Sequence, residues 1–418
     1  MEYGCIGEKL SHSFSKTIHN LLFDYDYQLK EIPKGELAGF MRSADFKAIN
    51  VTIPYKQDVI PFLDYIEETA KKIGAVNTIV KKDGKLYGYN TDFSGMSALI
   101  KRNNIILKDK KVLILGAGGT SKTVLAVSKS LGAREILRVN RTLDMPDVIS
   151  YEEANKFHTD AQIIINTTPC GMYPKIGESA VDIDNFPNLE AVADAVYNPL
   201  ASHLVVTAKE KGINAVGGLY MLVAQAVFAA EKFTGDNIKD SKIEEVYSKI
   251  LLSKKNLVLI GMPGCGKTTI GKALAKELDK VFIDTDLEIV KRTERKAKDI
   301  IESDGEAAFR KIESEVIADI AARQGAVIAT GGGAVLNKRN VELLKENGTL
   351  VFIDKPLDLL ATTDDRPLSS SRELLKQRYR ERYHIYKNAA DCTIAGQFDL
   401  AQNIKAVKEV FLNENSCN

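Results

Sequence analysis

The sequence predicts an α/β protein built from two or three domains. At two places a short apolar run leads into a glycine-rich loop and then into apolar residues at helical spacing. These are Lys111–Leu115 followed by Gly116–Ser121, and Leu257–Ile260 followed by Gly261–Thr268. Strand, glycine loop and helix in this order are typical of parallel sheets that bind nucleotides at the loop. A chain of 418 residues is also too long for one ordinary domain.

The composition is that of a soluble globular protein, with 44% hydrophobic residues, 27% charged residues and a net charge of +1. No nucleic-acid-binding character follows from that charge. The first residues lack a signal segment, and the apolar stretch Met221–Ala230 is too short to span a bilayer. The cysteines are scattered without metal-ligand spacing, so we expect reduced thiols in the cytoplasm and no membrane role; they are Cys5, Cys170, Cys265, Cys392 and Cys417.

Small polar side chains end or interrupt three strand-like runs of the first hundred residues. They are Thr52, Asn77 and Asp92, and Lys56 stands close to the first of them. Such a group suits a substrate rich in hydroxyls, because each buried hydroxyl needs a partner. The residues alone leave other interpretations open: Lys56 could be a solvated surface lysine, and Asp92 could cap a helix that starts at Phe93.

The middle of the chain predicts a dinucleotide-binding βαβ unit. Its two strands are Lys111–Leu115 and Glu135–Val139. An NAD-binding unit usually has an acidic residue after the second strand, whereas a 2′-phosphate suits the polar and basic residues found here, so NADP is favoured. The expected cofactor-binding residues are Gly116, Ala117, Gly118, Gly119, Thr120 and Ser121 of the loop, with Asn140, Arg141 and Thr142 after the second strand.

Four motifs of the first segment resemble the signatures of the shikimate dehydrogenase family and occur in the family's order. They are Ser11–Ser15, Asn50–Lys56, Gly74–Thr78 and Asn90–Asp92. The resemblance implies that Lys56 is the acid/base, that Gly218 faces the nicotinamide, and that Tyr197 and Gln225 reach the substrate. It also implies that the ring hydroxyls and carboxylate of shikimate are held by Ser13, Ser15, Thr52, Asn77 and Asp92.

The segment Gly261–Thr268 fits G-x-x-x-x-G-K-[ST] at every position. The glycines of such a loop turn backbone N–H groups inward around phosphate oxygens. Lys267 is expected to reach the β/γ-phosphates, and Thr268 to offer its hydroxyl to Mg²⁺. The expected ATP-binding residues of the loop are Gly264, Cys265, Gly266, Lys267, Thr268 and Thr269.

Two carboxylates and three arginines follow the phosphate loop in the sequence. An expected strand, Val281–Asp286, ends in Asp284 and Asp286, which could serve a metal and a substrate respectively. The separated arginines suggest an anionic acceptor and a phosphoryl group in transfer; they are Arg310, Arg366 and Arg382.

This C-terminal set resembles shikimate kinase in its phosphate loop, Phe-x-Asp-x-Asp, Gly-Glu-x-x-Phe-Arg-x-x-Glu, Thr-Gly-Gly-Gly, Arg-Pro-Leu and Arg-x-x-x-Tyr motifs. The resemblance implies that Asp286 holds the acceptor hydroxyls and accepts the proton, and that Arg310 and Arg382 grip the carboxylate. It implies that Gly331, Gly332 and Gly333 let the backbone approach the ring. Arg366 would reach the γ-phosphate, and Thr268 with Asp284 would serve Mg²⁺.

We therefore expect an α/β substrate domain at 1–101 and about 219–250, a Rossmann-like NADP domain at 102–218, and a P-loop kinase domain with a parallel sheet at 255–418. The expected enzyme reduces 3-dehydroshikimate with NADPH and phosphorylates shikimate with ATP. The alternatives are a quinate/shikimate dehydrogenase fused to a small-polyol kinase, or a nucleotide-gated sensor built on inactive copies of these folds. The sequence does not predict an oligomeric state.

Overall fold

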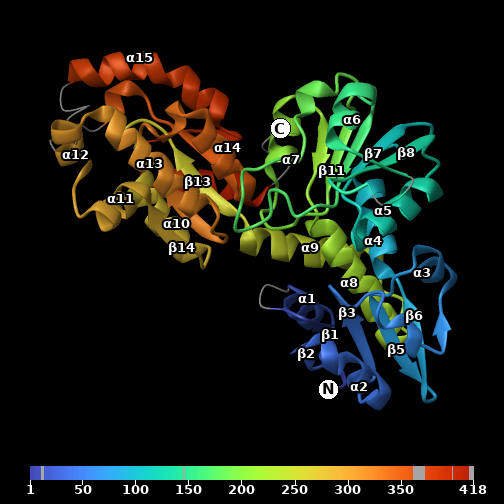
Figure 1. Ribbon diagram of the computed structural model, residues 1–418. Coiled ribbons are helices and arrows are strands. Elements are labelled where there is room, and N and C mark those ends of the chain that lie inside the picture. The colour runs from blue at the N-terminus through green and yellow to red at the C-terminus, as the bar shows by residue number, and fades with distance from the viewer. Residues whose placement is uncertain (11–13, 144, 146, 361–371, 398, 414–418) are drawn as a thin grey trace. The chain divides into compact units, whose positions relative to one another are not determined.

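The computed structural model describes residues 1–10, 14–143, 145, 147–360, 372–397 and 399–413. The chain divides into two compact units (Figure 1). One comprises Met1–Met172, Glu178–Tyr197 and Thr207–Ile250, and the other comprises Tyr173–Gly177, Asn198–Val206 and Leu251–Asn418. Within the described ranges, no helix has both the length and the apolar character needed to cross a membrane.

The first unit opens with a mixed six-stranded sheet of order β2-β1-β3-β5-β6-β4. β1 is parallel to β2 and β3, whereas β5 is antiparallel to β3 and β6. Asp83 and Gly84, both at positive φ, close the tight turn between β5 and β6. The strands are β1 Tyr3–Gly7, β2 Tyr27–Glu31, β3 Ala48–Val51, β4 Tyr65–Ile66, β5 Thr78–Lys82 and β6 Lys85–Tyr89, and the helices are α1 Ser15–Leu22, α2 Leu37–Ser43 and α3 Glu68–Ile73.

The second sheet has six parallel strands in the order β12-β11-β10-β7-β8-β9. The chain changes direction across the sheet at β7, and ligands of such sheets bind beyond the carboxyl ends of the strands at this point. The strands are β7 Lys111–Leu115, β8 Glu135–Val139, β9 Val148–Ile149, β10 Ile163–Asn166, β11 Ala191–Asp194 and β12 Asn214–Val216, and the helices are α4 Thr91–Arg102, α5 Gly119–Ser130, α6 Tyr151–Phe157 and α7 His203–Glu210.

Helix α8, Leu219–Thr234, follows the second sheet and packs against α4 and the first sheet. A Cβ atom at Gly95 of α4 would lie 2.7 Å from the Met221 carbonyl oxygen, so only glycine allows this approach. Further along α8, Ala229 and Phe233 join the buried cluster around Cys5 and Tyr27. Helix α9, Asp240–Lys254, leads from here toward the P-loop strand.

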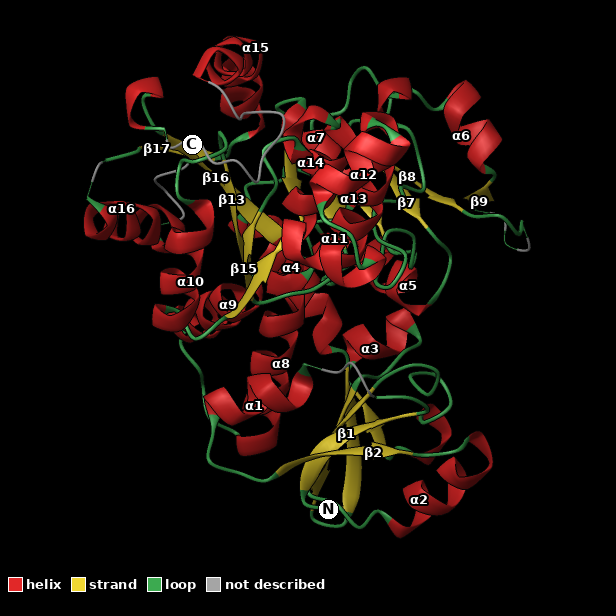
Figure 2. Cartoon of the chain, turned by 90° about the vertical axis from the view of Figure 1, so that its left-hand side faces the viewer, coloured by secondary structure: helices red, strands yellow, loops and turns green. Residues whose placement is uncertain are grey.

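The C-terminal sheet has five parallel strands in the order β14-β15-β13-β16-β17. Figure 2 labels β15, β13, β16 and β17 of this sheet. The strands are β13 Asn256–Ile260, β14 Val281–Asp284, β15 Ala326–Ala329, β16 Gly348–Asp354 and β17 Cys392–Ala395. The helices are α10 Lys267–Glu277, α11 Thr285–Thr293, α12 Ala297–Asp304, α13 Glu306–Ala321, α14 Lys338–Asn347, α15 Arg372–Ala389 and α16 Leu400–Leu412.

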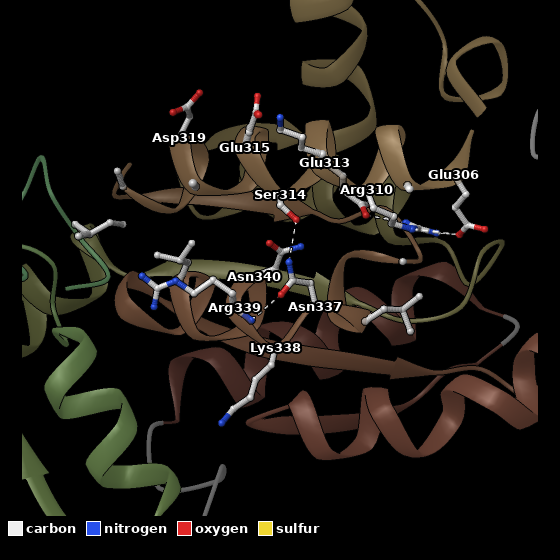
Figure 3. A pocket seen from close by; sticks show the side chains of 18 of the residues that line it. Glu306, Arg310, Glu313, Ser314, Glu315, Asp319, Asn337, Lys338, Arg339 and Asn340 are labelled. Carbon is white, nitrogen blue, oxygen red and sulfur yellow. Dashed lines mark hydrogen bonds and ion pairs between the residues drawn. The ribbon is translucent and has the colours of Figure 1, made fainter. Parts of the chain in front are cut away.

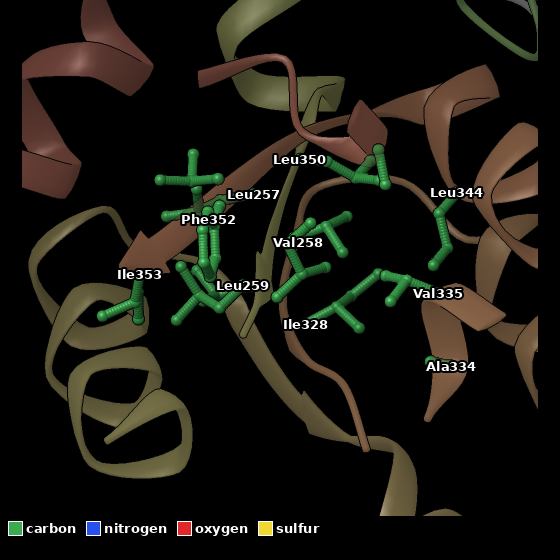
Figure 4. Close-up of a cluster of buried hydrophobic side chains, with 14 of the residues drawn as sticks. Leu257, Val258, Leu259, Ile328, Ala334, Val335, Leu344, Leu350, Phe352 and Ile353 are labelled. Atoms are coloured by element: carbon green, nitrogen blue, oxygen red, sulfur yellow. The ribbon is translucent and has the colours of Figure 1, made fainter. Parts of the chain in front are cut away.

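Buried aliphatic residues of neighbouring strands hold this sheet together (Figure 4). Leu257 and Val258 of β13, Ile328 of β15 and Ile353 of β16 are all 0% exposed. Burying each such side chain contributes roughly 1.5–3 kcal/mol, so the continuous apolar runs read from the sequence supply the main stabilisation of the strands that carry the phosphate loop. The predicted α/β class, with a parallel sheet in the C-terminal part, is confirmed.

Two sequence expectations were wrong. The strand after α10 ends at Asp284, and Asp286 lies in the first turn of α11. The reason is local: Asp284 caps the helix by accepting hydrogen bonds from the backbone N–H of Asp286 at 3.0 Å and of Leu287 at 3.4 Å. The thiols are also not all reduced, since Cys392 is disulfide-bonded, and sequence spacing does not report pairs that only folding brings together.

Candidate active sites

A lysine–carboxylate pair marks the first candidate site. Lys56 Nζ lies 2.6 Å from Asp92 Oδ2, and the two side chains are only 19% and 12% exposed. Asp92 is in the first turn of α4, but Asn90, not Asp92, caps that helix by accepting from the Phe93 backbone N–H. The alternative of a helix-capping Asp92 and a surface Lys56 therefore fails, and the pair is instead a partly buried ion pair able to hold a proton donor in place.

Backbone hydrogen bonds fix this pair beside Asn77. The Lys56 carbonyl accepts from the Val76 N–H at 2.8 Å, which ties the lysine to the segment that leads into Asn77. The Asn77 Oδ1 atom accepts from the Thr91 N–H at 2.8 Å, next to Asp92. Within the described chain the Asn77 side-chain nitrogen makes no hydrogen bond, so it is available to donate to a ligand.

The other predicted substrate residues have different degrees of support. Thr52 is half-buried, and its backbone N–H donates to the Ile6 carbonyl at the end of β1. Ser15 begins α1 and shares a side-chain hydrogen bond with Tyr27. A Cβ on Gly95, one turn after Asp92, would lie 2.9 Å from the Gln225 Cβ, so Gln225 packs against α4, and its side-chain nitrogen donates to the Leu222 carbonyl at 2.9 Å. Ser13 is outside the described residues.

One neighbour of this site, Cys5, was not singled out by the sequence, and it lies close to Tyr197, which was. Burial raises the pKa of the Cys5 thiol to about 12, although the nearby positive charge of Lys56 opposes that rise. Burial, followed by the proximity of Cys5, raises the pKa of the Tyr197 phenol. The Phe14 ring lies 5.4 Å from the Tyr197 ring. Cys5 and Tyr197 are thus neutral groups in the surroundings of Lys56, but Cys5 carried no sequence signal because it reads as an ordinary strand residue.

The glycine loop after β7 has the form expected of a pyrophosphate-binding turn. Gly116 has φ +104°, a conformation that favours glycine. A Cβ at Gly118 or Gly119 would meet no heavy atom within 4 Å, so the space over the start of α5 is open. Ala117 and Thr120 are half-buried, whereas Ser121 is buried and its hydroxyl has no hydrogen-bond partner among the described residues.

The residues after β8 lie next to this loop. The Gly116 N–H donates to the Val139 carbonyl at 2.7 Å, which joins the two strand ends. Asn140 Nδ2 donates to Thr142 Oγ1 at 2.9 Å, and Arg141 is exposed. Gly218 is the residue before α8, and a side chain there would collide with the Ala195 carbonyl at the end of β11. The predicted cofactor residues outside the loop thus all follow the carboxyl ends of strands of the second sheet; they are Asn140, Arg141, Thr142 and Gly218.

The phosphate loop after β13 is the centre of the second candidate site. Gly261, Gly264 and Gly266 all have positive φ values, as an inward-turned loop requires. The Lys267 ammonium is buried and donates to the carbonyls of Gly261 at 2.7 Å and Met262 at 3.1 Å. Cys265 is buried, whereas Thr269 is exposed at the start of α10.

Thr268 and Asp284 are adjacent, as a shared metal ligand set requires. The Thr268 hydroxyl donates to Asp284 Oδ2 at 2.8 Å, while Oδ1 of the same carboxylate caps α11. Hydroxyl and carboxylate oxygens are the donors that Mg²⁺ prefers, usually together with phosphate oxygens and water.

A cavity of about 570 Å³ brings the phosphate loop and the predicted acceptor residues together. Its lining includes Lys267, Thr268, Thr269, Asp284, Asp286, Arg310, Gly331, Gly332, Gly333 and Arg382. Arg382 is buried and donates to the Gly332 carbonyl at 3.2 Å, and the Tyr386 hydroxyl donates to the same oxygen. Arg366 is outside the described residues.

The glycines after β15 are required by close neighbours. A Cβ at Gly331 would lie 2.7 Å from Asp286 Oδ1 and 2.9 Å from Glu313 Oε1, and one at Gly333 would overlap the Arg310 guanidinium. None of the three glycines has a positive φ, so the reason is space and not backbone conformation. Glycine here lets the carboxylate and the guanidinium line the cavity.

Arg310 is held by two carboxylates on its own helix. It donates to Glu306 Oε1 at 2.8 Å and to Glu313 Oε2 at 2.7 Å (Figure 3). Burial alone would lower the pKa of Arg310, but Glu313 and Glu306 raise it overall. Burial raises the pKa of the Glu313 carboxyl, with Arg310 opposing and Asp286 adding to the rise. A second, open hollow of about 1340 Å³ shares Arg310, Glu313 and Gly333 with the cavity.

Two families match parts of the chain. Residues 5–79 match the shikimate dehydrogenase substrate binding domain, and residues 263–411 match shikimate kinase. The shikimate dehydrogenase (NADP(+)) of Clostridium beijerinckii is 40% identical over 262 residues, which cover 59% of this chain and 96% of the relative. That of Methanosphaera stadtmanae is 38% identical over 258 residues, 56% of this chain and 90% of the relative.

Solved structures agree with these relatives. A chorismate mutase/shikimate 5-dehydrogenase fusion protein from Clostridium acetobutylicum is similar with a TM-score of 0.57 and 37% identity, covering 59% of this chain and 96% of that one. Shikimate 5-dehydrogenase from Thermus thermophilus, solved in complex with NADP(H) and shikimate, has a TM-score of 0.54 and 29% identity, covering 60% and 99%.

The folds and sites define the class of protein as a nucleotide-dependent oxidoreductase joined to a P-loop phosphotransferase. The chain belongs to the shikimate dehydrogenase family, and its C-terminal part is a shikimate kinase domain. It is thus a bifunctional enzyme of the shikimate pathway, as the sequence motifs predicted.

Proposed function

We propose that this cytoplasmic enzyme reduces the C3 ketone of 3-dehydroshikimate with NADPH and then phosphorylates the new hydroxyl with ATP, giving shikimate 3-phosphate and ADP. The observation that carries the proposal is the single cavity in which a phosphate loop meets Asp286, Arg310 and Arg382. That cavity offers a phosphoryl donor site, a carboxylate for a hydroxyl, and guanidinium groups for an acid. Shikimate supplies both the hydroxyl and the acid.

In the dehydrogenase step, the ketone oxygen gains negative charge as its carbon is reduced. Bound NADPH would supply the hydride. The Lys56 ammonium, held at 2.6 Å from Asp92, would stabilise that charge and give the oxygen a proton. Asn77 and Thr52, with Ser13 and Ser15 by resemblance, would orient the ring hydroxyls and the carboxylate, and Tyr197 and Gln225 would border the ring. In this role Asp92 both fixes Lys56 and accepts from a substrate hydroxyl.

The second sheet fits NADP(H) in two respects. The loop from Gly116 to Thr120 exposes backbone at the start of α5, where a pyrophosphate would gain from the N–H groups. A 2′-phosphate would lie at the three residues after β8, which are Asn140, exposed Arg141 and Thr142. None of these three is the acidic residue that would favour NAD.

In the kinase step, Lys267 would leave the carbonyls of its own loop and bind the β/γ-phosphates of ATP. Asp286 would orient the acceptor hydroxyl and take its proton. Arg310 and Arg382 would bind the acceptor carboxylate, which matches the charge-assisted bonds that arginine forms best. The assignment of Arg366 to the γ-phosphate comes from the resemblance alone.

A magnesium ion would be held by Thr268 and Asp284, together with ATP oxygens and water. The pair is 2.8 Å apart and turns one carboxylate oxygen toward the phosphate loop, which fits the donor set of this ion. The ion would offset charge on the phosphates.

We further propose three functional domains, with the substrate domain at 1–101 and about 219–250, the NADP domain at 102–218 and the kinase domain at 255–418. The two reactions share one ring oxygen, so ATP-driven removal of shikimate would draw the reversible reduction forward.

The test is an assay of the full chain with 3-dehydroshikimate, NADPH, ATP and Mg²⁺, in which NADPH loss and ADP release are followed separately. We expect NADPH loss without ATP, and ADP release only when NADPH or added shikimate is present. Quinate and other small polyols in place of shikimate form the comparison arm. Faster turnover of quinate would point to the alternative enzyme pair, and nucleotide binding without turnover would point to a sensor.

A further inference from the structure

A third arginine lines the kinase cavity beside the two that the motifs identified. Arg378 lies on α15, one helical turn before Arg382, so both side chains project from the same face of the helix. Arg378 is half-buried and lines the same cavity as Lys267 and Asp286. No motif singled it out, because an arginine in a helix rich in basic residues reads as a solvated surface group.

The three guanidinium groups differ in their partners. Arg310 is bound by Glu306 and Glu313, and Arg382 donates to the Gly332 carbonyl. Arg378 makes no hydrogen bond and no ion pair with any residue that the structure describes. A guanidinium that is partly removed from water and left unpaired is costly, and an incoming anion would offset that cost.

The charged groups around Arg378 include the other two arginines of the cavity. Burial lowers the pKa of Arg378, and Arg382 and Arg310 lower it further, while Glu306 and Glu381 oppose them. Arginine nevertheless remains charged at any ordinary pH. Besides Glu381 on its own helix, its charged neighbours are thus Arg382, Glu306 and Arg310, and both arginines line the cavity with it.

We propose that Arg378 is a specificity-determining residue that binds the carboxylate of the acceptor together with Arg310 and Arg382. The inference rests on the proposed kinase function and adds a selection for acids over neutral ring alcohols of the same shape. A carboxylate can accept from several guanidinium N–H groups, since each oxygen has two lone-pair sites. The third arginine strengthens binding of the acid and does not take part in phosphoryl transfer.

The experiment compares Arg378→Met with Arg380→Met in the full chain. Arg380 is an exposed arginine on the same helix that does not line the cavity, so it controls for loss of helix charge. Loss of one charge-assisted contact should raise the KM for shikimate by roughly tenfold in Arg378→Met, while kcat and the KM for ATP stay within about twofold. Arg380→Met should leave all three constants unchanged, and Arg378→Lys should restore part of the affinity.

Shikimate methyl ester, which lacks the negative charge, provides the second arm. The wild type and Arg378→Met should turn over the ester with the same KM, because the contact that distinguishes them is gone. An unchanged KM for shikimate in Arg378→Met overturns the inference, as does a change confined to kcat or to the KM for ATP, which would place Arg378 at the phosphates. A wild type that releases no ADP with shikimate instead refutes the proposed kinase function itself.

Discussion

The lysines of the two candidate active sites, partly buried Lys56 and buried Lys267, have different kinds of partner. In the dehydrogenase site Lys56 is paired with a carboxylate from a distant part of the chain, Asp92, at 2.6 Å. In the kinase site Lys267 instead donates to backbone carbonyls of its own loop, Gly261 and Met262. The first lysine therefore has its charge partner in place, whereas the second would, in the proposed kinase step, exchange neutral partners for phosphate oxygens.

This difference follows from the chemistry. Proton transfer to a carbonyl oxygen needs a donor fixed to within a fraction of an ångström, which a side-chain ion pair between separate elements provides. Phosphoryl transfer needs positive charge arranged around a large anion, so the lysine of the phosphate loop can keep neutral backbone partners until that anion binds.

The largest effect is expected from Lys267→Ala. Losing the charge at the β/γ-phosphates should lower kinase kcat by on the order of a thousandfold. Dehydrogenase turnover should not change, because Lys56 and the second sheet are untouched. Initial rates of ADP release and NADPH loss on one preparation measure both. Lys276→Ala, an exposed lysine on the same helix, is the matched control; an equal loss in it would mean that α10 charge alone is responsible.

Lys56→Ala should give the reciprocal result. Removing the proton donor should lower the rate of NADPH loss by roughly a hundredfold or more, with kinase rates on added shikimate preserved. Lys72→Ala, exposed on α3, should behave as the wild type. If Lys56→Ala kept full reductase turnover, the paired lysine would be structural and the contrast between the two sites would disappear.

A smaller effect is expected at the cofactor end of the dehydrogenase. Arg141→Ala should raise the KM for NADPH about tenfold and leave the KM for NADH nearly unchanged, since only NADPH carries the 2′-phosphate. Arg134→Ala changes an exposed arginine just before the amino end of β8 and should affect neither cofactor. Equal shifts for both cofactors would show that Arg141 does not select between them.

The smallest effect on activity is expected from His19, which should mainly alter acid stability. Burial lowers the pKa of His19 from 6.5 to about 3, and its ring stacks on Tyr27 at 4.0 Å. The unfolded chain therefore binds the extra proton, so stability is full above pH 6.5 and falls as the pH drops toward 3. His19→Phe keeps an aromatic ring against Tyr27 but cannot take up a proton in the unfolded chain. The loss in free energy of unfolding on going to about pH 5 should therefore be smaller by about 2 kcal/mol in this variant.

The measurement is the temperature at which reductase activity is lost, followed across pH for wild type and His19→Phe. Only the slope of the inactivation temperature against pH is compared, because the variant also loses the hydrogen bond to Tyr25 at every pH. His384→Phe, in the other unit and exposed, should keep the wild-type slope. Identical slopes for His19→Phe and wild type would remove His19 as the acid-sensitive group.

Local sequence patterns predicted the fold and the loops well. The apolar runs at Lys111–Leu115 and Glu135–Val139 are strands with those bounds, and the glycine loops follow β7 and β13 as expected. These features depend on neighbouring residues alone: a buried run needs apolar side chains, and a phosphate loop needs glycines at positive φ. The family resemblance then supplied residues from separate motifs that the cavity brings together, such as Asp286 and Arg382.

Contacts between distant segments could not be predicted in the same way. The reason for Gly333 is the Arg310 guanidinium, which approaches from another helix. Arg378 and Cys5 reach their sites only through packing, and periodicity does not say which helix face or strand face meets a ligand. The sequence predicted Asp286 at the end of a strand. In the structure Asp284 caps α11, which ends the strand two residues earlier, and the sequence did not show which of the two structures would form there.

Asp284 links the two halves of the kinase reaction mechanically. Its Oδ2 atom accepts a hydrogen bond from the Thr268 hydroxyl, which is proposed to bind the metal. Its Oδ1 atom accepts from the backbone N–H of Asp286. A cation that shifted the Asp284 carboxylate on binding would therefore also shift Asp286, the residue proposed to orient the acceptor hydroxyl. Replacing Asp284 to change the metal preference would thus also be expected to weaken binding of the acceptor hydroxyl.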